Sequence, residues 1–269
     1  MVVFVGVKKG KLAKLKDYSE EEPKTVYEEV RLKKGKVTLI LYTSGKLLLQ
    51  GNQQEVAKIA LELEKIKIGK KEKSEEFWEE NGWIIGSDES LKGDTFGGIT
   101  VAAVKADEKI RKKLLEMGVA DSKTLSDGEV LRLADKIRKV AACEVKSIYP
   151  QEYNDSPLTI THWLNKLHHE CAEYLQPGKH VVDKFPGCQV GELQEEKAES
   201  KYLEVAAASI LARDAALRQL NALSAQAGFH LPKGSTHVQL ALVELKHRKL
   251  NFTQFVKINF WNVKDFLKE

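Results

Sequence analysis

The sequence lacks several features that would place it in a specialised class of protein. Its 269 residues include only three cysteines, Cys143, Cys171 and Cys188, which are widely spaced and form no Cys-x-x-Cys pair. This spacing indicates neither a disulfide framework nor a zinc site, so we expect all three to be reduced and structural. No apolar run approaches the roughly 18–20 residues needed to span a bilayer. The apolar residues 1–7 have no basic flank before them, unlike a secretory signal, so we expect a cytoplasmic protein.

The positive charge of the chain is distributed unevenly. The net charge is +4, but residues 1–78 hold 17 Lys and Arg against 12 Asp and Glu, whereas residues 79–269 hold 26 against 27. A basic module beside a nearly neutral one suggests an electrostatic anchor for a polyanion, joined to a site with another task. A solvated charged surface is the alternative interpretation, and charge alone does not decide between the two.

A polar, highly charged stretch divides the sequence into two predicted domains. Residues 69–78 show no apolar periodicity and are typical of a linker. We therefore predict a first domain over residues 1–68 and a second over residues 79–269.

The first domain is predicted to be a small antiparallel sheet covered by a helix. Residues 37–42 and 46–50 are strand-like and flank a tight turn that contains Gly45. Residues 9–18 and 55–66 have apolar residues at helical spacing.

The second domain has the mixed pattern of an α/β protein. Strands are predicted near residues 83–85, 96–104, 143–149 and 181–182, and helices over residues 126–140, 157–175, 202–226, 237–249 and 253–268. The helix after Ser126 opens with the spacing of a capping box, Ser126 to Glu129. Alternating strands and helices argue for a central mixed sheet with helices packed on it.

Four carboxylates stand at the ends of predicted elements. Asp88 and Glu89 follow one apolar strand, Asp183 ends another, and Glu199 precedes a small-residue helix face. Adjacent buried acids are costly unless a positive charge compensates them, and Mg²⁺ prefers carboxylate oxygens. If the four acids converge, two such ions can activate water against a phosphodiester. For any one acid alone, a helix cap or a surface ion pair is the alternative interpretation.

A glycine-rich loop follows the first pair of acids. Residues 90–98 contain three glycines, which let backbone amides approach a ligand closely, and Lys92, a cation suited to phosphate. The loop matches neither the Walker nor the dinucleotide fingerprint. A simple hairpin turn is the alternative.

In four segments, the chain resembles the type 2 ribonuclease H family. Residues 86–99 resemble its first catalytic motif, residues 118–125 its Asp-Ser-Lys segment, residues 181–183 the strand of the third acid and residues 197–213 the segment of the fourth. The resemblance implies an α/β (α+β) fold with a ribonuclease H-like mixed sheet flanked by helices. It also implies a small N-terminal α/β domain similar to the TATA-binding protein.

Three features favour the ribonuclease HIII branch over ribonuclease HII. The fourth acid is Glu199 where ribonuclease HII has aspartate, the N-terminal module is similar to the extension typical of HIII, and Ser235 stands where HII has a tyrosine. One departure concerns the family's Gly-x-Gly turn, which here is Leu91-Lys92-Gly93. The missing glycine leaves the amide geometry at Leu91 open.

The resemblance implies roles for individual residues. Asp88, Glu89, Asp183 and Glu199 would be both the catalytic and the metal-binding acids, holding two Mg²⁺ or Mn²⁺ ions. Nucleic-acid contacts are implied for the backbone at Leu91, Lys92 and Gly93, which would meet the 2′-hydroxyl of RNA, and for Ser122 and Lys123.

Two further groups of residues are interpreted from their chemistry alone. Basic residues on or beside the strands of the first domain would neutralise phosphates and make binding sensitive to salt; they are Arg31, Lys33, Lys34, Lys36 and Lys46. No role is assigned to His168, His169, His230 and His237, and we expect them to be structural.

The implied activity is endonucleolytic cleavage of the RNA strand of an RNA–DNA hybrid. We expect a monomer that leaves 5′-phosphate and 3′-hydroxyl ends and has no membrane partner. Incision at single ribonucleotides in duplex DNA, as in ribonuclease HII, is one alternative. A non-catalytic nucleic-acid-binding protein is another. A phosphotransferase is disfavoured, since the glycine-rich loop lacks a Gly-Lys-Ser/Thr phosphate grip.

Overall fold

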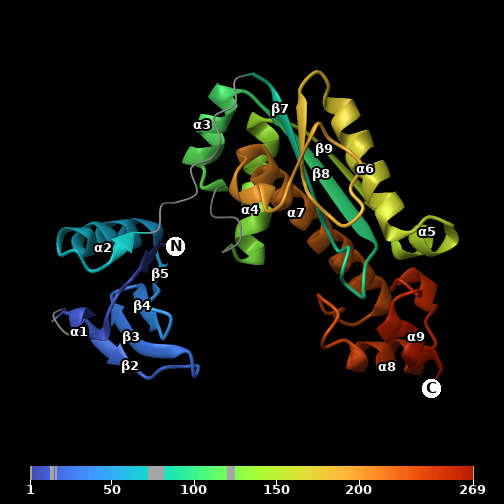
Figure 1. Cartoon of the computed structure of the whole chain (residues 1–269). Coiled ribbons are helices and arrows are strands. Elements are labelled where there is room, and N and C mark those ends of the chain that lie inside the picture. Colours follow the sequence, from blue (N-terminus) through green and yellow to red (C-terminus); the bar gives the residue numbers. More distant parts are fainter. Residues whose placement is uncertain (1, 13–14, 16, 72–81, 120–124, 269) are drawn as a thin grey trace. The chain divides into compact units, whose positions relative to one another are not determined.

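The computed structural model describes residues 2–12, 15, 17–71, 82–119 and 125–268 (Figure 1). The chain divides into two compact units, Met1–Glu76 and Phe77–Glu269, which are described separately. In the part of the chain that is described, no helix is both long and apolar enough to cross a membrane.

Within its described residues, the first unit is a fully antiparallel sheet with two helices. Its strands lie in the order β2-β3-β4-β5-β1-β6. The strands are β1 (Val2–Val5), β2 (Ser19–Glu21), β3 (Glu28–Lys34), β4 (Val37–Tyr42), β5 (Leu47–Gly51) and β6 (Lys70–Lys71), and the helices are α1 (Lys9–Leu12) and α2 (Gln53–Lys65). Apolar residues of β4 and β5 pack against Val56, Ile59 and Leu63 of α2 in one buried cluster. The predicted sheet and covering helix are both present.

Four strands of this sheet go beyond the two that the sequence predicts. In β3, only Val30 and Leu32 are buried, and charged residues surround them. β2 is a short, acidic edge strand that pairs with β3 from Ser19 to Glu21. Pairing with a neighbour, rather than its own apolar pattern, makes β2 a strand, which is typical of short edge strands.

The second unit is built on a mixed sheet in the order β11-β10-β7-β8-β9. The strands β11, β10 and β7 are mutually parallel, whereas β8 runs antiparallel to both β7 and β9. The strands are β7 (Ile84–Ser90), β8 (Ile99–Ala106), β9 (Ala142–Ile148), β10 (Lys179–Asp183) and β11 (Leu193–Glu195). The helices are α3 (Glu108–Glu116), α4 (Asp127–Val140), α5 (Pro150–Asp155), α6 (Ile160–Leu175), α7 (Leu203–Ala227), α8 (Gln239–His247) and α9 (Trp261–Lys268).

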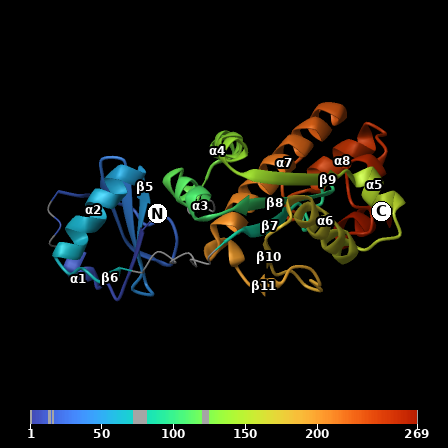
Figure 2. The ribbon, with the colours of Figure 1, turned by 90° about the horizontal axis from the view of Figure 1, so that it is seen from above.

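Helices cover both faces of this sheet. Along β8, Ala102 and Val104 pack in the cluster that contains α3, α4 and α7, whereas Val101 and Ala103 pack in the cluster that contains α6. This alternation follows from the two-residue period of a strand, and Figure 2 shows α7 and α6 on opposite sides of the strands. The predicted central sheet flanked by helices is therefore confirmed.

The helix α7 lies very close to β7. A Cβ atom at Gly86 would come within 2.3 Å of the Val205 backbone nitrogen, so only glycine fits at this position of the strand. Buried alanines over residues 206–208 keep the facing side of α7 equally small. The close approach positions the start of α7 directly beside the acidic residues that follow Gly86.

Two predicted helix boundaries are wrong. Pro157 does not open a helix; α6 begins at Ile160, where the Thr159 hydroxyl accepts a hydrogen bond from the His162 N–H, and Pro150 opens the separate helix α5. The predicted helix over residues 253–268 is a 3₁₀ turn at Phe252–Gln254 followed later by α9. Local apolar spacing does not reveal that residues 255–257 are instead drawn into contact with the glycine-rich loop.

Candidate active site

The four acids come from three neighbouring elements of the second unit. Asp88 and Glu89 lie within β7, not after it, because the strand continues to Ser90. Val182 pairs with Ser87 across the parallel strands, so Asp183 follows on β10 beside Asp88 on β7. The Ala198 N–H donates to Asp183 Oδ1 at 2.8 Å, which brings the 3₁₀ turn that carries Glu199 to the same strand end.

Asp88 and Asp183 are destabilised in their charged forms. Asp88 is only 8% exposed, and burial, followed by the charges of Glu89 and Asp183, raises its pKa well above the ordinary value. Burial also raises the pKa of Asp183 to about 6, helped by Glu199 and Glu89 and opposed by the Ala198 amide. These mutual effects place the four carboxylates in one electrostatic cluster.

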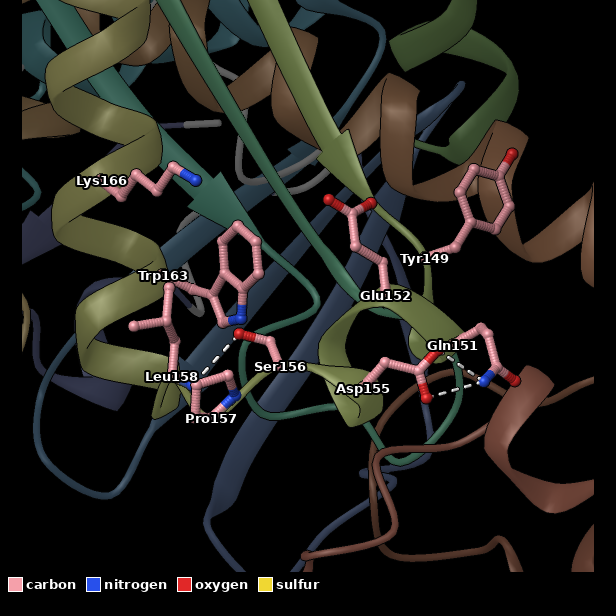
Figure 3. Close-up of a pocket in the computed structure, with 9 residues that line it drawn as sticks. All are labelled: Tyr149, Gln151, Glu152, Asp155, Ser156, Pro157, Leu158, Trp163 and Lys166. Atoms are coloured by element: carbon pink, nitrogen blue, oxygen red, sulfur yellow. Dashed lines mark hydrogen bonds between the residues drawn. The ribbon is translucent and has the colours of Figure 1, made fainter.

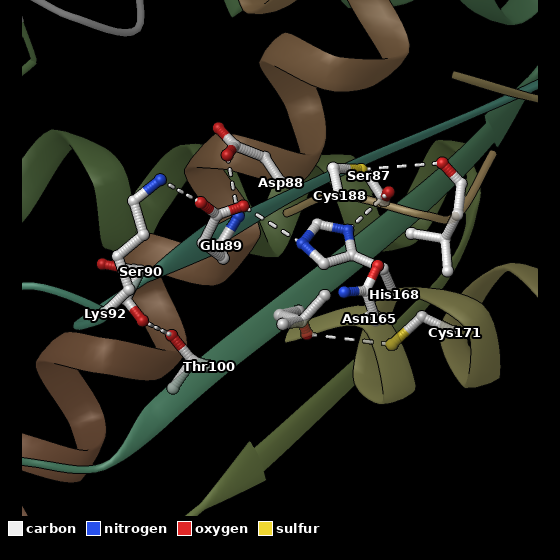
Figure 4. Close-up of polar contacts among 12 residues, drawn as sticks. Ser87, Asp88, Glu89, Ser90, Lys92, Thr100, Asn165, His168, Cys171 and Cys188 are labelled. Carbon is white, nitrogen blue, oxygen red and sulfur yellow. Dashed lines mark hydrogen bonds and ion pairs between the residues drawn. The ribbon is translucent and has the colours of Figure 1, made fainter. Parts of the chain in front are cut away.

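Glu89 differs from its neighbours because two basic groups contact it. Its Oε2 atom lies 3.0 Å from His168 Nε2, and its Oε1 atom pairs with the Lys92 ammonium (Figure 4). Burial raises the pKa of Glu89, but the hydrogen bond from His168 and the charges of His168 and Lys92 outweigh it, so the pKa is lower than usual. These two contacts therefore hold Glu89 in its ionised form.

A buried chain of hydrogen bonds extends from Glu89 into the core. Ser87 Oγ lies 2.7 Å from both His168 Nδ1 and His180 Nε2, and all three side chains are almost fully buried. Burial, and then the charge of His168, lower the pKa of His180 to about 4, so this imidazole is neutral at pH 7. Because a carboxylate only accepts, Nε2 of His168 must donate to Glu89.

His168 and His180 are the residues that sequence reasoning missed at this site. From the sequence, His168 is expected only to be structural. The residues next to it in the chain do not indicate its contact with Ser87, which lies 81 positions away. The position of His168 on the buried face of α6 was the one available hint. His230 and His237 remain without a role, and His169 is exposed.

The donor set suits a hard divalent cation, although the side chains are not yet arranged around one. Among the residues described, no group of three or more His, Cys, Asp or Glu side chains is placed to hold a metal ion. Instead, Glu89 is paired with His168 and Lys92, and Asp183 accepts from the Ala198 amide. Burial among like charges disfavours the ionised form of Asp88, and a cation would stabilise that form.

The turn at Leu91-Lys92-Gly93 is formed although leucine replaces the first glycine of the family's Gly-x-Gly turn. Leu91 has φ +67°, the left-handed conformation that favours glycine, which costs a leucine about 1–2 kcal/mol. Its side chain is 5% exposed and packs in the cluster that contains Phe96 and Leu220. Burying a leucine contributes about 2 kcal/mol, which offsets the strain and retains the turn.

The basic residues of the first unit differ in how buried they are and in how far nearby carboxylates already balance their charge. Arg31 is largely buried and pairs with Glu21 and Glu28 at 3.2 Å each, so its charge is already balanced within the chain. Lys33, 3.4 Å from Glu21, keeps half of its side chain exposed. Lys34 lies 3.4 Å from Glu62 and 4.9 Å from the Tyr18 ring centroid. Lys33 is therefore better placed for an external phosphate than Arg31.

Two predicted nucleic-acid contacts cannot be placed. Ser122 and Lys123 lie outside the described residues. Ser235 is described, and its carbonyl accepts from Asn262 Nδ2 at 3.3 Å. The Gly234 N–H donates to Asp94 Oδ2 at 2.8 Å, so the segment around Ser235 lies against the glycine-rich loop.

One hollow of the described surface lies away from the acids. It has a volume of about 710 Å³ and is lined by residues of α5, the turn after it and the start of α6, among them Ser156, Leu158, Trp163 and Lys166 (Figure 3). None of the four carboxylates lines this hollow. This hollow is therefore not the site formed by the acids.

Comparison with known proteins identifies the class to which this fold and site belong. The sequence profile of the family described as Ribonuclease HII matches residues 85–263, which include all four acids. A ribonuclease HII of Archaeoglobus fulgidus, solved in complex with PCNA, is similar over 66% of this chain and 95% of its own, with 28% identity and a TM-score of 0.59. The fold and the matched segment thus define a nuclease of the type 2 ribonuclease H class.

Two further relatives are ribonucleases HIII, and the second of them is similar over nearly the whole chain. Ribonuclease HIII of Streptococcus agalactiae serotype Ia is 34% identical over 227 residues, which is 74% of each chain. The structure of Bst-RNase HIII in complex with Mn²⁺ covers 99% of this chain and 98% of its own, with 25% identity and a TM-score of 0.63. The chain therefore belongs to the ribonuclease HIII branch of the ribonuclease HII family. The predicted family, fold class and enzyme class, an endoribonuclease of the ribonuclease H type, are confirmed.

Proposed function

We propose that this ribonuclease hydrolyses the RNA strand of RNA–DNA hybrids, using Asp88, Glu89, Asp183 and Glu199 to hold two Mg²⁺ or Mn²⁺ ions. The observation that carries the proposal is the buried Asp88 carboxylate, whose pKa is raised well above normal by burial and by Glu89 and Asp183. A buried acid among acids is a poor choice for a structural role. It is a good ligand once a cation is present.

The chemistry divides between the bound ions and the side chains. Divalent ions lower the pKa of a bound water and stabilise the leaving oxygen of a phosphodiester. Before binding, Lys92 and His168 hold Glu89 in its ionised form. Lys92 is 45% exposed, so it can leave Glu89 and pair with a substrate phosphate instead. The ends produced would be a 5′-phosphate and a 3′-hydroxyl.

The exposed turn after β7 is the proposed reader of the ribose. Lys92 and Gly93 are exposed, and within the described part of the chain their backbone N–H groups donate no hydrogen bond. Free amides on a fixed turn can donate to a 2′-hydroxyl, the group that distinguishes RNA from DNA. Ser122 and Lys123 complete the proposed contacts of the second domain.

We assign substrate binding to the first domain, predicted over residues 1–68, and catalysis to the second, predicted over residues 79–269. Of the predicted linker 69–78, Lys70 and Lys71 form β6 and belong to the sheet of the first unit. Lys33, Lys36 and Lys46 would meet phosphates there, while Arg31 holds Glu21 and Glu28 in place. The enzyme would work as a cytoplasmic monomer. Its proposed partner is the hybrid duplex, whose uniform phosphate backbone requires no base-reading element.

Replacing Asp88 by Asn tests the proposal directly. Cleavage of a labelled hybrid with Mg²⁺ or Mn²⁺ should fall at least about a thousandfold, because metal-based stabilisation is worth several kcal/mol. Hybrid binding should change little. Asp265→Asn, on the exposed side of α9, is the matched control. Normal cleavage by Asp88→Asn would show that the assignment of this acid is wrong. If the wild-type protein instead cut preferentially at a lone ribonucleotide in duplex DNA, its activity would be that of ribonuclease HII.

A further inference from the structure

A fully buried lysine lies beneath the turn that follows the acids. Lys257 has no exposed surface, and its Nζ atom donates to the carbonyl oxygens of Leu91 at 3.0 Å, Gly97 at 2.7 Å and Gly98 at 3.0 Å. An ammonium group has three N–H donors, so all three are used. A lysine is almost never fully buried without such partners.

The three acceptors belong to both ends of a single loop. Leu91 begins the loop in the left-handed conformation, and Gly97 and Gly98 end it before β8. The Leu91 carbonyl also accepts from the Asp94 N–H at 3.2 Å. One ammonium group therefore joins the entry and the exit of the loop, and it fixes the carbonyl that sets the orientation of the Leu91–Lys92 peptide.

The backbone around Lys257 is bound to the same loop. The Gly97 N–H donates to the Phe255 carbonyl at 3.0 Å, and the Lys257 N–H donates to the Thr95 carbonyl at 3.3 Å. Phe96 and Val256 form an antiparallel bridge. These backbone contacts thus fix the position of Lys257 beside the loop, so its side chain does not depend on its own flexibility to reach the three carbonyls.

Burying the charged ammonium group of Lys257 is unfavourable unless its contacts compensate for the lost hydration. Burial lowers the pKa of Lys257 to about 7, although Asp94 acts in the opposite direction. The three carbonyl oxygens favour the ammonium form, because a neutral amine has only two N–H groups to donate. A methionine would fill the same space without a buried charge, but it would leave those oxygens without this donor.

We propose that Lys257 is a positioning residue that holds the Leu91–Gly93 backbone in the conformation that recognises the ribose 2′-hydroxyl. The inference rests on the proposed function, since it concerns how the same enzyme distinguishes RNA from DNA. Lys257 touches neither the acids nor the exposed turn surface, so it acts on the turn through the Leu91 carbonyl, while its bonds to Gly97 and Gly98 fix the other end of the loop. Losing it frees the Lys92 and Gly93 amides to move, while the carboxylates and the phosphate contacts remain.

The test compares Lys257→Met with Lys264→Met, an exposed lysine on α9. Binding to an RNA–DNA hybrid and to an all-DNA duplex of the same sequence is measured by fluorescence anisotropy in EDTA. The hybrid preference should fall about tenfold in Lys257→Met, which corresponds to about 1.4 kcal/mol, the scale of one or two hydrogen bonds. With Mg²⁺, KM for the hybrid should rise by a similar factor, and kcat should stay within about threefold. Lys264→Met should match the wild type.

Two outcomes would overturn the role of Lys257. One is a wild-type hybrid preference in Lys257→Met, and the other is an equal loss of affinity for hybrid and DNA duplex, which indicates general loosening of the fold. Lys257→Leu, which removes all three N–H donors, gives the same comparison if the Met variant does not fold; an unchanged preference there also rejects the role. A wild-type protein that neither prefers nor cuts the hybrid would instead reject the proposed function itself.

Discussion

His168 Nε2 lies 3.0 Å from Glu89 Oε2, and the two residues are 79 positions apart in the chain. The contact joins the buried face of α6 to an acid on β7, and Ser87 and His180 extend it inward through two bonds of 2.7 Å. These hydrogen bonds hold the carboxylate of Glu89 in one orientation from the side of the core. Hydrogen bonds of this kind orient a metal ligand and tune its basicity.

Removing the imidazole should therefore impair the site without removing an acid. His168→Ala is expected to lower metal affinity or kcat about 10- to 100-fold, the usual cost of losing the partner of a ligand. Isothermal titration with Mn²⁺ and hybrid cleavage assays measure the two quantities. His169→Ala, an exposed neighbour, is the control. Equal behaviour of both variants would mean that the contact with Glu89 has no part in the reaction.

Metal binding should release protons in mildly acidic solution. The pKa of Asp183 is raised to about 6 and that of Asp88 is also raised, so both acids bind protons at a pH where ordinary carboxylates are charged. A cation must displace those protons. Below about pH 6 the apparent affinity should thus fall, by about tenfold per pH unit for each proton displaced. Titrations with Mn²⁺ between pH 5 and 8, in buffers of different ionisation enthalpy, measure both effects; a constant affinity across this range would contradict the raised pKa values.

Binding of the hybrid should depend on salt through the first domain. Lys33→Gln and Lys36→Gln should each reduce the slope of log Kd against log salt by about one, as expected when one phosphate contact is lost. Anisotropy titrations with hybrid from about 50 to 300 mM KCl provide the slopes. Lys268→Gln, which removes an exposed lysine of α9 paired with Asp265, is the matched control. Parallel slopes for all the proteins would place the phosphate contacts elsewhere.

Much of the second domain is readable from local pattern. The capping box of Ser126 and Glu129 is formed as its spacing predicts, and Gly228 ends α7 in the left-handed conformation. Asp88, Glu89 and Asp183 were recognisable because acids interrupt apolar strand segments. Short edge strands such as β2 were not, since they take their conformation from a neighbour.

The sequence by itself determined which four acids are proposed for the site, their order and the strands that carry three of them, because strand and helix periodicity and motif spacing are properties of consecutive residues. Only the tertiary structure decided what those acids touch. His168 meets Glu89 across 79 positions, and Lys257 meets Leu91 across 166. No local pattern encodes such pairs, because they arise when helices and C-terminal segments pack against the sheet. Leu91 shows the same limit: a leucine keeps a glycine-like turn because its side chain is buried in the core and its carbonyl is bound by a distant lysine.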